Sequence, residues 1–411
     1  MKLFEIFKSS VFFRFALVIN GIGSCALAIA YPYFLLASKI ESKWVFIIQA
    51  IIFSAAAIGT YLWAHILDQS KNIWLLKFYA VSAEIVFSIL VFLSFNFDWS
   101  FGLKCLFIVV LQFLFAFEIP WSRIAFNELP ENKTKDAKIV SQEITVAATL
   151  IGIFAPALGT LSVNSKNMLF LTQLNIFSFL PYAIIAYLLF NFRRDTQDNS
   201  QVAKKMNTLA FVNFIKKDLF WRNLFLSMTF LILSISLLMS SLPYILFSEL
   251  GSLGQYAIPG FYLCTGLIST LLNGQRIREH IPEIIKYNFS GIIILVILSG
   301  ISFFAFQGLI AKIISYSLFN TTLIAFNILF MNKVYECEHK GIHSRLFSVS
   351  QLLSRFAIPI TSFYLSFFSD EQVCSGVRTS FAIVGVICIL LFMLSEAKIF
   401  FKKKDKAHEG V

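Results

Sequence analysis

Uncharged runs long enough to cross a membrane are the feature that most constrains this chain. A helix needs about 20 apolar residues to cross the hydrocarbon core of a bilayer. Lipid also requires every backbone amide to be paired within its own segment, which favours helices. Eight stretches of at least 20 residues lack Asp, Glu, Lys and Arg: 15–38, 44–64, 144–165, 167–192, 223–248, 250–275, 287–311 and 313–332. These runs predict membrane-spanning helices.

Four less regular segments complete an expected set of twelve spans. They are residues 75–97, 102–126, 344–368 and 379–395. The first three contain charged residues, and the last is only 17 residues long. Composition agrees, because 14% of the residues are charged, whereas a soluble domain has about 25%. The first apolar segment is too long for a cleavable signal. We expect an all-α polytopic membrane protein, with twelve transmembrane helices in two six-helix halves.

The basic residues are distributed unevenly between the two sides of the expected membrane. With both termini on one side, 24 of the 34 Lys and Arg residues lie on that side, 6 on the other and 4 within or at the ends of spans. This asymmetry predicts cytoplasmic termini in the cell inner membrane. The net charge of +11 therefore reflects topology and lipid headgroups, and predicts no nucleic-acid partner.

The longest polar connection divides the chain near its middle. We expect an N-terminal six-helix half at 1–192, a cytoplasmic linker at 193–218, a C-terminal six-helix half at 219–400 and a basic tail at 401–411. The second part of the linker, about 206–217, is amphipathic, which is typical of an interfacial helix. Pro156 and Pro359 lie 203 residues apart, and the same shift places Ser141 on Ser344. This spacing fits a duplicated unit.

The segment PWSRIAFNELPENKTKDAKIVSQEITVAATLIGIFAPALGTL, residues 120–161, resembles the region of spans four and five in efflux-type bacterial members of the major facilitator superfamily. Residues that fit the pattern are Arg123, Leu129, Pro130, Pro156 and Gly159. The loop AHILDQSKN (64–72) keeps Asp68 of the loop signature. The resemblance implies alternating access, a monomer, and gating or helix-packing roles for Pro156, Gly159, Asp68 and Arg123.

Polar residues at helical spacing predict a water-filled cavity. An arginine at the depth of Arg355 costs roughly 2.5–3.5 kcal/mol to insert, so it needs water, a counter-ion or a ligand. Ser344, Ser348, Gln351, Arg355, Pro359 and Ser362 share one helix face. Lys312, Tyr316, Asn320 and Asn327 share another, and the first span contributes Asn20. The central positive charge favours an anionic substrate.

Three carboxylates inside spans are candidates for proton coupling: Glu118, Glu84 and Glu143. The resemblance implies that the first and fourth helices of each half line the cavity, which favours Glu118. As an alternative, Glu118 pairs with Arg123 at the membrane edge. Glu84 must face inward between helices or be protonated in lipid, and its alternative role is that of a neutral or paired packing carboxyl.

No enzyme or metal motif stands out, since HExxH, CxxC and Walker sequences are missing from the chain. We therefore expect neither an enzyme nor a cofactor. The leading hypothesis is proton-coupled export of a small anionic organic molecule, such as a carboxylate siderophore or an amphipathic drug. An importer of a metabolite or siderophore with the same fold is one alternative. A membrane-embedded enzyme or a sensor is the alternative from another class.

Overall fold

A computed structural model gives the fold. It describes residues 10–70, 72–128, 147, 150–162, 164–192, 213, 216–250, 254–272, 289–306, 308–336 and 340–408. Within these residues all regular secondary structure is helical, and each of the twelve predicted spans overlaps a helix. The chain forms two compact units. Unit 1 contains Met1–Asn199, Pro243–Leu263 and Ser362–Asp370, and unit 2 contains Ser200–Leu242, Cys264–Thr361 and Glu371–Val411.

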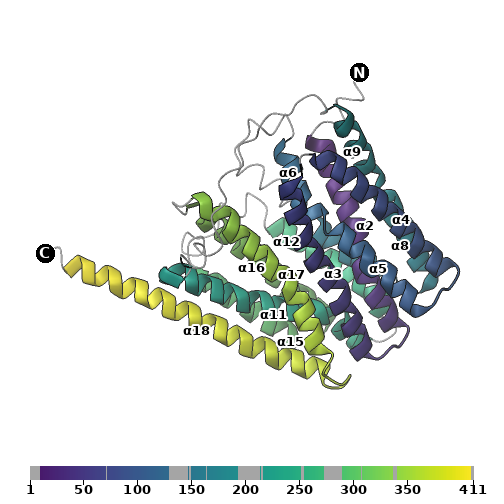
Figure 1. Cartoon of the computed structure of the whole chain (residues 1–411). Helices are drawn as coiled ribbons and strands as arrows, with labels where there is room; N and C mark the ends of the chain where they lie inside the picture. Colours follow the sequence, from purple (N-terminus) through teal and green to yellow (C-terminus); the bar gives the residue numbers. More distant parts are fainter. Residues whose placement is uncertain are drawn as a thin grey trace. The chain divides into compact units, whose positions relative to one another are not determined.

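The N-terminal helices overlap the predicted spans, and Figure 1 labels most of them. In chain order they are α2 (Ser10–Ala37), α3 (Ser42–Gln69), α4 (Ile73–Asn96), α5 (Phe101–Phe115), α6 (Glu118–Glu128), the helix Leu150–Gly159, α8 (Ser165–Ser178) and α9 (Leu180–Phe192). Within unit 1, α4 packs against α5, α8 and α9, while α2 packs against α8. One face of α4 is therefore covered by other helices of this unit, and Lys77, Glu84 and Ser88 are buried on it.

Two predicted spans are broken by proline. The fourth span consists of α5 and α6, with a turn at Ala116 and Phe117 before Pro120. The sixth consists of α8 and α9, which meet at Phe179 before Pro181. Proline has no N–H to donate and its ring clashes with the carbonyl four residues earlier. The first of these breaks places Glu118 in the first turn of α6, where a carboxylate is favourable for the helix dipole.

Close backbone approach fixes the helix packing of unit 1. A Cβ atom added at Gly159 would come within 2.7 Å of the Ala26 carbonyl oxygen of α2, and one at Gly59 of α3 within 2.7 Å of the Phe113 carbonyl oxygen of α5. Small residues permit such contacts between membrane helices. Asp370 adds a cap to α3: its carboxylate accepts the Ser42 N–H at 3.2 Å, whereas the Glu41 side chain makes no capping bond.

The remaining helices are α11 (Leu219–Leu250), α12 (Gly254–Leu272), α15 (Phe289–Ala305), α16 (Leu309–Glu336), α17 (Lys340–Leu365) and α18 (Val373–His408). In unit 2, α15 packs against α16 and α18. Helix α18 continues well past the predicted end of its span at residue 395. Lysine is a good helix former, so leaving the apolar run does not end the helix. The predicted linker helix at 206–217 lies almost entirely outside the described residues.

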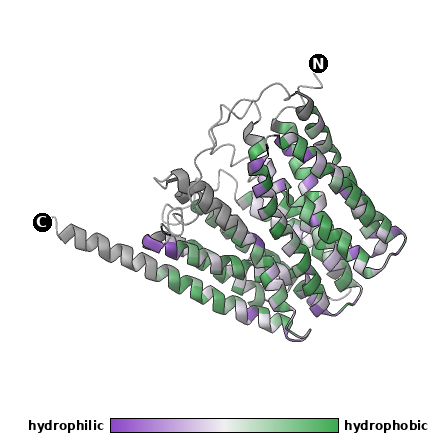
Figure 2. Cartoon of the chain, viewed as in Figure 1, coloured by the Kyte–Doolittle hydropathy of each residue, from purple (hydrophilic) through white to green (hydrophobic). Residues whose placement is uncertain are grey.

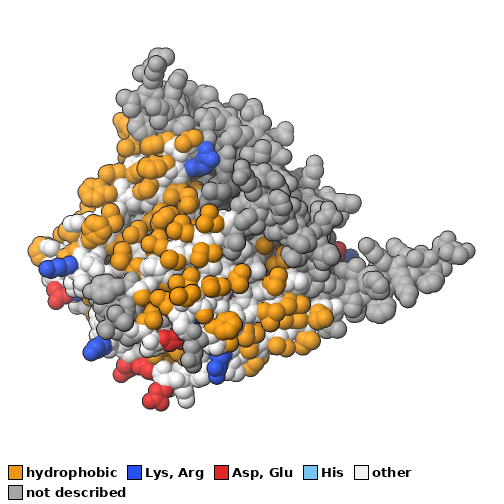
Figure 3. All heavy atoms as spheres, turned by 180° about the vertical axis from the view of Figure 1, so that it is seen from behind, with side chains coloured by type: hydrophobic (Ala, Val, Ile, Leu, Met, Phe, Trp, Pro, Cys, Tyr) orange, Lys and Arg blue, Asp and Glu red, His pale blue; other side chains and the backbone are white. Residues whose placement is uncertain are grey.

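Eight described helices are long and apolar enough to cross a membrane, and three shorter apolar helices accompany them. Figure 2 shows hydrophobic residues along most of their length. Figure 3 shows one face on which most described side chains are hydrophobic, with charged side chains gathered mainly along its lower margin. Large exposed side chains such as Leu271, Ile310 and Phe367 are more than 70% exposed. An apolar outer surface of this kind indicates a multi-pass membrane protein.

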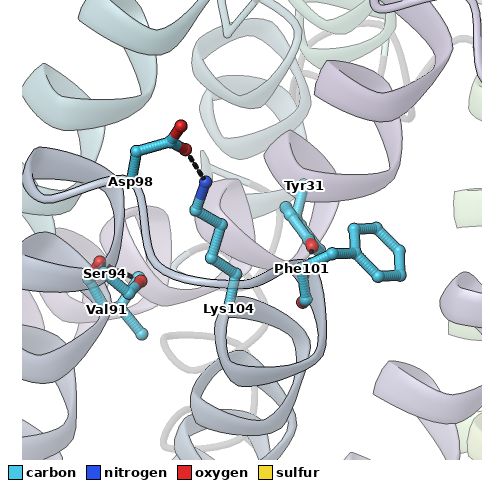
Figure 4. A network of polar contacts seen from close by, with 6 residues as sticks. All are labelled: Tyr31, Val91, Ser94, Asp98, Phe101 and Lys104. Atoms are coloured by element: carbon cyan, nitrogen blue, oxygen red, sulfur yellow. Dashed lines mark hydrogen bonds and ion pairs between the residues drawn. The ribbon is translucent and has the colours of Figure 1, made fainter.

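The connection between α4 and α5 is held by local contacts (Figure 4). Asp98 adopts a positive φ of 47°, a conformation that Asp tolerates better than most residues. Its carboxylate pairs with Lys104 in the first turn of α5. The hydrogen bond from Lys104 lowers the pKa of Asp98 below its ordinary value. Because the Asp98 side chain is 92% exposed, this pair contributes little to stability.

Candidate functional site

A buried ion pair lies inside unit 1, between α4 and α6. The Lys77 ammonium donates to the Glu118 carboxylate, and the two side chains are 0% and 3% exposed. Lys77 lies in the first turns of α4, and the break at Ala116 and Phe117 brings Glu118 opposite it. A buried charge is costly unless it is paired. The two residues therefore depend on one another.

Aromatic rings enclose the Lys77 ammonium. Its Nζ lies 4.8 Å from the ring centre of Trp121 and 4.6 Å from that of Tyr182. Trp121 donates its indole N–H to the Ile73 carbonyl at 3.1 Å, which fixes the ring against the start of α4. Phe13 of α2 stacks on Trp121 and meets Tyr182 edge-on. We call Lys77, Glu118, Trp121, Tyr182 and Phe13 the cage. Cation–π contacts of this kind partly replace the hydration that the ammonium loses on burial.

Glu84 lies two helical turns beyond Lys77 on the same face of α4. It is 0% exposed, and neither carboxylate oxygen has a hydrogen-bond partner among the described residues. Lys77 and Glu118 both act on it electrostatically. One ammonium neutralises one carboxylate, and Glu118 already has that ammonium. Glu84 is therefore a second buried carboxyl beside a pair whose single ammonium is already bound, and a buried carboxylate without its own counter-charge is costly.

Further along α4, a hydrogen-bond network joins four helices. The Ser24 hydroxyl of α2 donates to Asn175 Oδ1 of α8 at 3.2 Å, and Asn175 Nδ2 donates to the Ser88 hydroxyl of α4 at 3.0 Å. Gln112 Nε2 of α5 donates to the Ser24 carbonyl at 3.1 Å. These four side chains are at most 3% exposed. Buried networks in which each member has a partner hold helices in a fixed register.

The predicted carboxylates differ in where they lie. Glu84 faces inward between helices, so the alternative of a lipid-facing carboxyl is removed. Glu118 pairs with Lys77. The alternative partner of Glu118, Arg123, has a side chain outside the described part of the structure, as does Asp68. Glu143 also lies outside the described residues.

The predicted cavity residues are spread over both units. Asn20 is 0% exposed in unit 1. In unit 2, Lys312 donates to the Phe303 carbonyl at 3.1 Å, and the Tyr316 hydroxyl bonds Met239 Sδ at 2.8 Å. Asn320 and Arg355 are half-buried. Gln351 and Asn327 lie in helices, but their side chains are outside the described part of the structure. Pro156 and Gly159 lie in the helix Leu150–Gly159.

Sequence reasoning missed Lys77 as a site residue, together with Trp121, Tyr182 and Asn175. One signal was available: Lys77, Glu84 and Ser88 are spaced at seven and four residues, which places them on one face of a helix. The aromatic residues and Asn175 carried no such signal, because rings and single amides are common in membrane helices. Only the packing brings them to Lys77 and Ser88.

The described residues contain no group of three or more His, Cys, Asp or Glu that could hold a metal ion. No protein-family model matches the chain, and no curated protein matches it. Solved structures do match, over nearly the full length.

The nucleoside transporter NupG is 13% identical, with a TM-score of 0.67 over 94% of this chain and 98% of that one. A bacterial homologue of the iron transporter ferroportin, in an inward-facing state, is 13% identical, with a TM-score of 0.66 over 94% and 98%. A bacterial homologue of the lysosomal transporter Spinster is 14% identical, with a TM-score of 0.63 over 94% and 96%. The chain has the major facilitator fold. At these identities the likeness shows the fold alone, and the chemistry of this chain lies in the cage, Glu84 and the Ser24–Asn175–Ser88 network.

Proposed function

We propose that this chain is a secondary active transporter of the cytoplasmic membrane that couples proton movement to the export of a small anionic organic molecule. The observation that carries the proposal is the buried Lys77–Glu118 pair together with the Glu84 carboxyl, which has no hydrogen-bond partner among the described residues. Structural proteins seldom keep three ionisable groups in an apolar interior, and inside a membrane such groups commonly mark proton relays. The three neighbours in fold described above are named as transporters or as homologues of transporters.

The coupling step follows from charge balance. With Glu84 protonated, the Lys77 ammonium neutralises Glu118 alone, and the three side chains together carry no net charge. Loss of the Glu84 proton leaves two carboxylates to share one ammonium. The new negative charge draws Lys77 along α4 towards Glu84 and weakens its hold on α6. Since Lys77 and Glu118 belong to different helices, the protonation state of Glu84 would favour one helix arrangement over another.

The substrate class rests on positive charge in unit 2. Arg355 is a half-buried cation in the middle of α17, on the helix face that also carries Gln351. An arginine can bind a carboxylate through two parallel hydrogen bonds. A carboxylate siderophore or an amphipathic acid would suit such a group. The export direction rests on the resemblance of residues 120–161 to efflux-type carriers, and import of the same molecule is the alternative direction.

The proposal is tested by a paired metabolite profile of cell interior and medium. Cells expressing the wild-type chain, cells expressing Glu84→Gln and cells without the gene are compared in iron-replete and iron-starved media. We expect wild-type cells to release an anionic compound that cells without the gene retain. Glu84→Gln should abolish release of the compound into the medium against its concentration gradient. A protonophore should abolish the same release by wild-type cells.

Each other outcome removes a defined part of the proposal. Depletion of the compound from the medium by wild-type cells would establish import. Release that survives the protonophore would exclude proton coupling, and a neutral or cationic compound would exclude the role given to Arg355. Cys264→Ser, a conservative change at an exposed site on α12, is the matched control and should behave as the wild type.

A further inference from the structure

Helices α2 and α4 run through the core of unit 1 in the same register. At one level both contact the same two rings: Phe13 and the Lys77 ammonium each lie against Trp121 and Tyr182. At a second level both bond the same amide, because Ser24 and Ser88 each contact Asn175. The two levels are 11 residues apart in each helix, from 13 to 24 in α2 and from 77 to 88 in α4. The two helices are therefore parallel and aligned.

Asn20 and Glu84 occupy matching positions between these levels. Each lies seven residues beyond the cage and four residues before the network. Seven residues are close to two full turns, or about 10 Å of helix, so both side chains point in the direction of the contacts at either end. Both residues are 0% exposed.

Asn20 and Glu84 also share an absence of partners. The amide oxygen, the amide nitrogen and both carboxyl oxygens have no hydrogen-bond partner among the described residues. An unsatisfied buried polar group costs about 1–3 kcal/mol, and proteins commonly meet that cost with ordered water. Two such groups at one level of one core provide the two to four polar contacts that a buried water needs.

We propose that ordered water bridges Asn20 to Glu84 and carries the Glu84 proton between the cage and the Ser24–Asn175–Ser88 network. This inference rests on the proposed function. In the transfer, the Glu84 O–H bond breaks and a new O–H bond forms on the water, while one of the water's own O–H bonds breaks and that proton passes on to bulk water. Lys77 is then shared by the Glu84 and Glu118 carboxylates. Asn20 gives up no proton. It is a positioning residue, because its amide oxygen accepts from the water and holds it where Glu84 can reach it.

Infrared difference spectroscopy of the reconstituted protein tests the water bridge. Spectra are recorded at acid and alkaline pH, in water and in deuterium oxide, with no ligand added. We expect a protonated-carboxyl band that Glu84→Gln removes. In Asn20→Leu, hydrogen–deuterium exchange of this carboxyl should slow by about tenfold or more, the factor that corresponds to one hydrogen bond. Its C=O stretch should also move to higher frequency. Asn20→Ser keeps a polar atom and space for water, so it should stay close to the wild type.

The matched control is Asn167→Leu, the same change at the edge of α8, outside the network, and it should leave the band unchanged. A band that Asn20→Leu does not alter would overturn the bridge and leave proton binding by Glu84 in place. The absence of a Glu84-dependent band would overturn proton binding itself, and with it the proposed coupling. If Asn20→Leu does not fold, the wild type tests the bridge by itself. The O–H stretch of the bridging water should shift when the sample is prepared in oxygen-18 water, and it should vanish in Glu84→Gln. Its absence would overturn the bridge.

Discussion

Helices α4 and α15 make opposite use of burial. Helix α4 carries Lys77, Glu84 and Ser88 at no more than 1% exposure, and the first and last of these bond side chains of α6 and α8. Helix α15, in unit 2, contains no charged residue. The hydroxyls of Ser299 and Ser302 bond carbonyls of their own helix.

The difference shows two ways of fixing a membrane helix. The register of α4 is set by specific polar partners on other helices, so one substitution leaves a charge or an amide unsatisfied. The register of α15 is set mainly by shape, with a polar contact from Lys312 of α16, which donates to the Phe303 carbonyl. A Cβ atom at Gly300 would collide with the Phe381 ring, and one at Gly385 of α18 would come within 2.8 Å of Ile297 Cγ2. Specific chemistry is therefore concentrated around α4.

The largest effect is expected from breaking the ion pair at α4. Lys77→Met should lower the free energy of unfolding by about 3–5 kcal/mol, because it leaves the Glu118 carboxylate buried without a counter-charge. The double variant Lys77→Met/Glu118→Leu should regain most of that loss. Thermal unfolding in detergent measures both. Losses that simply add in the double variant would show that the two residues do not act as a pair.

Overpacking of α15 should have the next largest effect. Gly300→Val places methyl groups against the Phe381 ring and should cost about 1–3 kcal/mol. Adding Phe381→Leu should relieve the strain, since the smaller side chain makes room. The melting temperatures of the two single variants and the double variant give the coupling. No relief in the double variant would argue against shape as the device that fixes α15.

Serine substitutions compare the two helices directly. Ser88→Ala should cost about 1–3 kcal/mol, because the Asn175 amide loses its acceptor inside the core. Ser299→Ala should stay within about 0.5 kcal/mol, since it removes only a bond to its own helix. The same thermal assay measures both changes. Equal losses of stability in Ser88→Ala and Ser299→Ala would contradict the view that polar partners on other helices hold α4 but not α15.

The smallest effect is expected at the surface pair that follows α4. The pKa of Asp98 is lower in the folded chain than its ordinary value, because Lys104 donates to it. The pair therefore stabilises the folded state above the unfolded pKa of aspartate, and this stability is lost as the pH falls through the folded pKa. Melting temperature measured against pH should decline slightly more towards acid in the wild type than in Asp98→Asn. Parallel curves would mean that solvent screens the pair completely.

The spans could be predicted because lipid imposes a local rule. Each span needs about 20 apolar residues, and this rule located helices such as α2 and α11 within a few residues. The breaks before Pro120 and Pro181 were missed, although both prolines were visible. Proline is tolerated within membrane helices when neighbouring groups satisfy the freed carbonyls, and α2 and α11 continue through Pro32 and Pro243.

For the site, the sequence by itself determined that Glu84 and Glu118 are carboxyls at membrane depth, because hydropathy and charge are local properties. It did not pair them, since an ion pair depends on which helices pack together. Only the tertiary structure paired Lys77 with Glu118, placed its ammonium against the rings of Trp121 in α6 and Tyr182 in α9, and set Asn20 level with Glu84. The physical reason is distance along the chain: 41 residues separate Lys77 from Glu118, and contacts over such separations follow from helix packing.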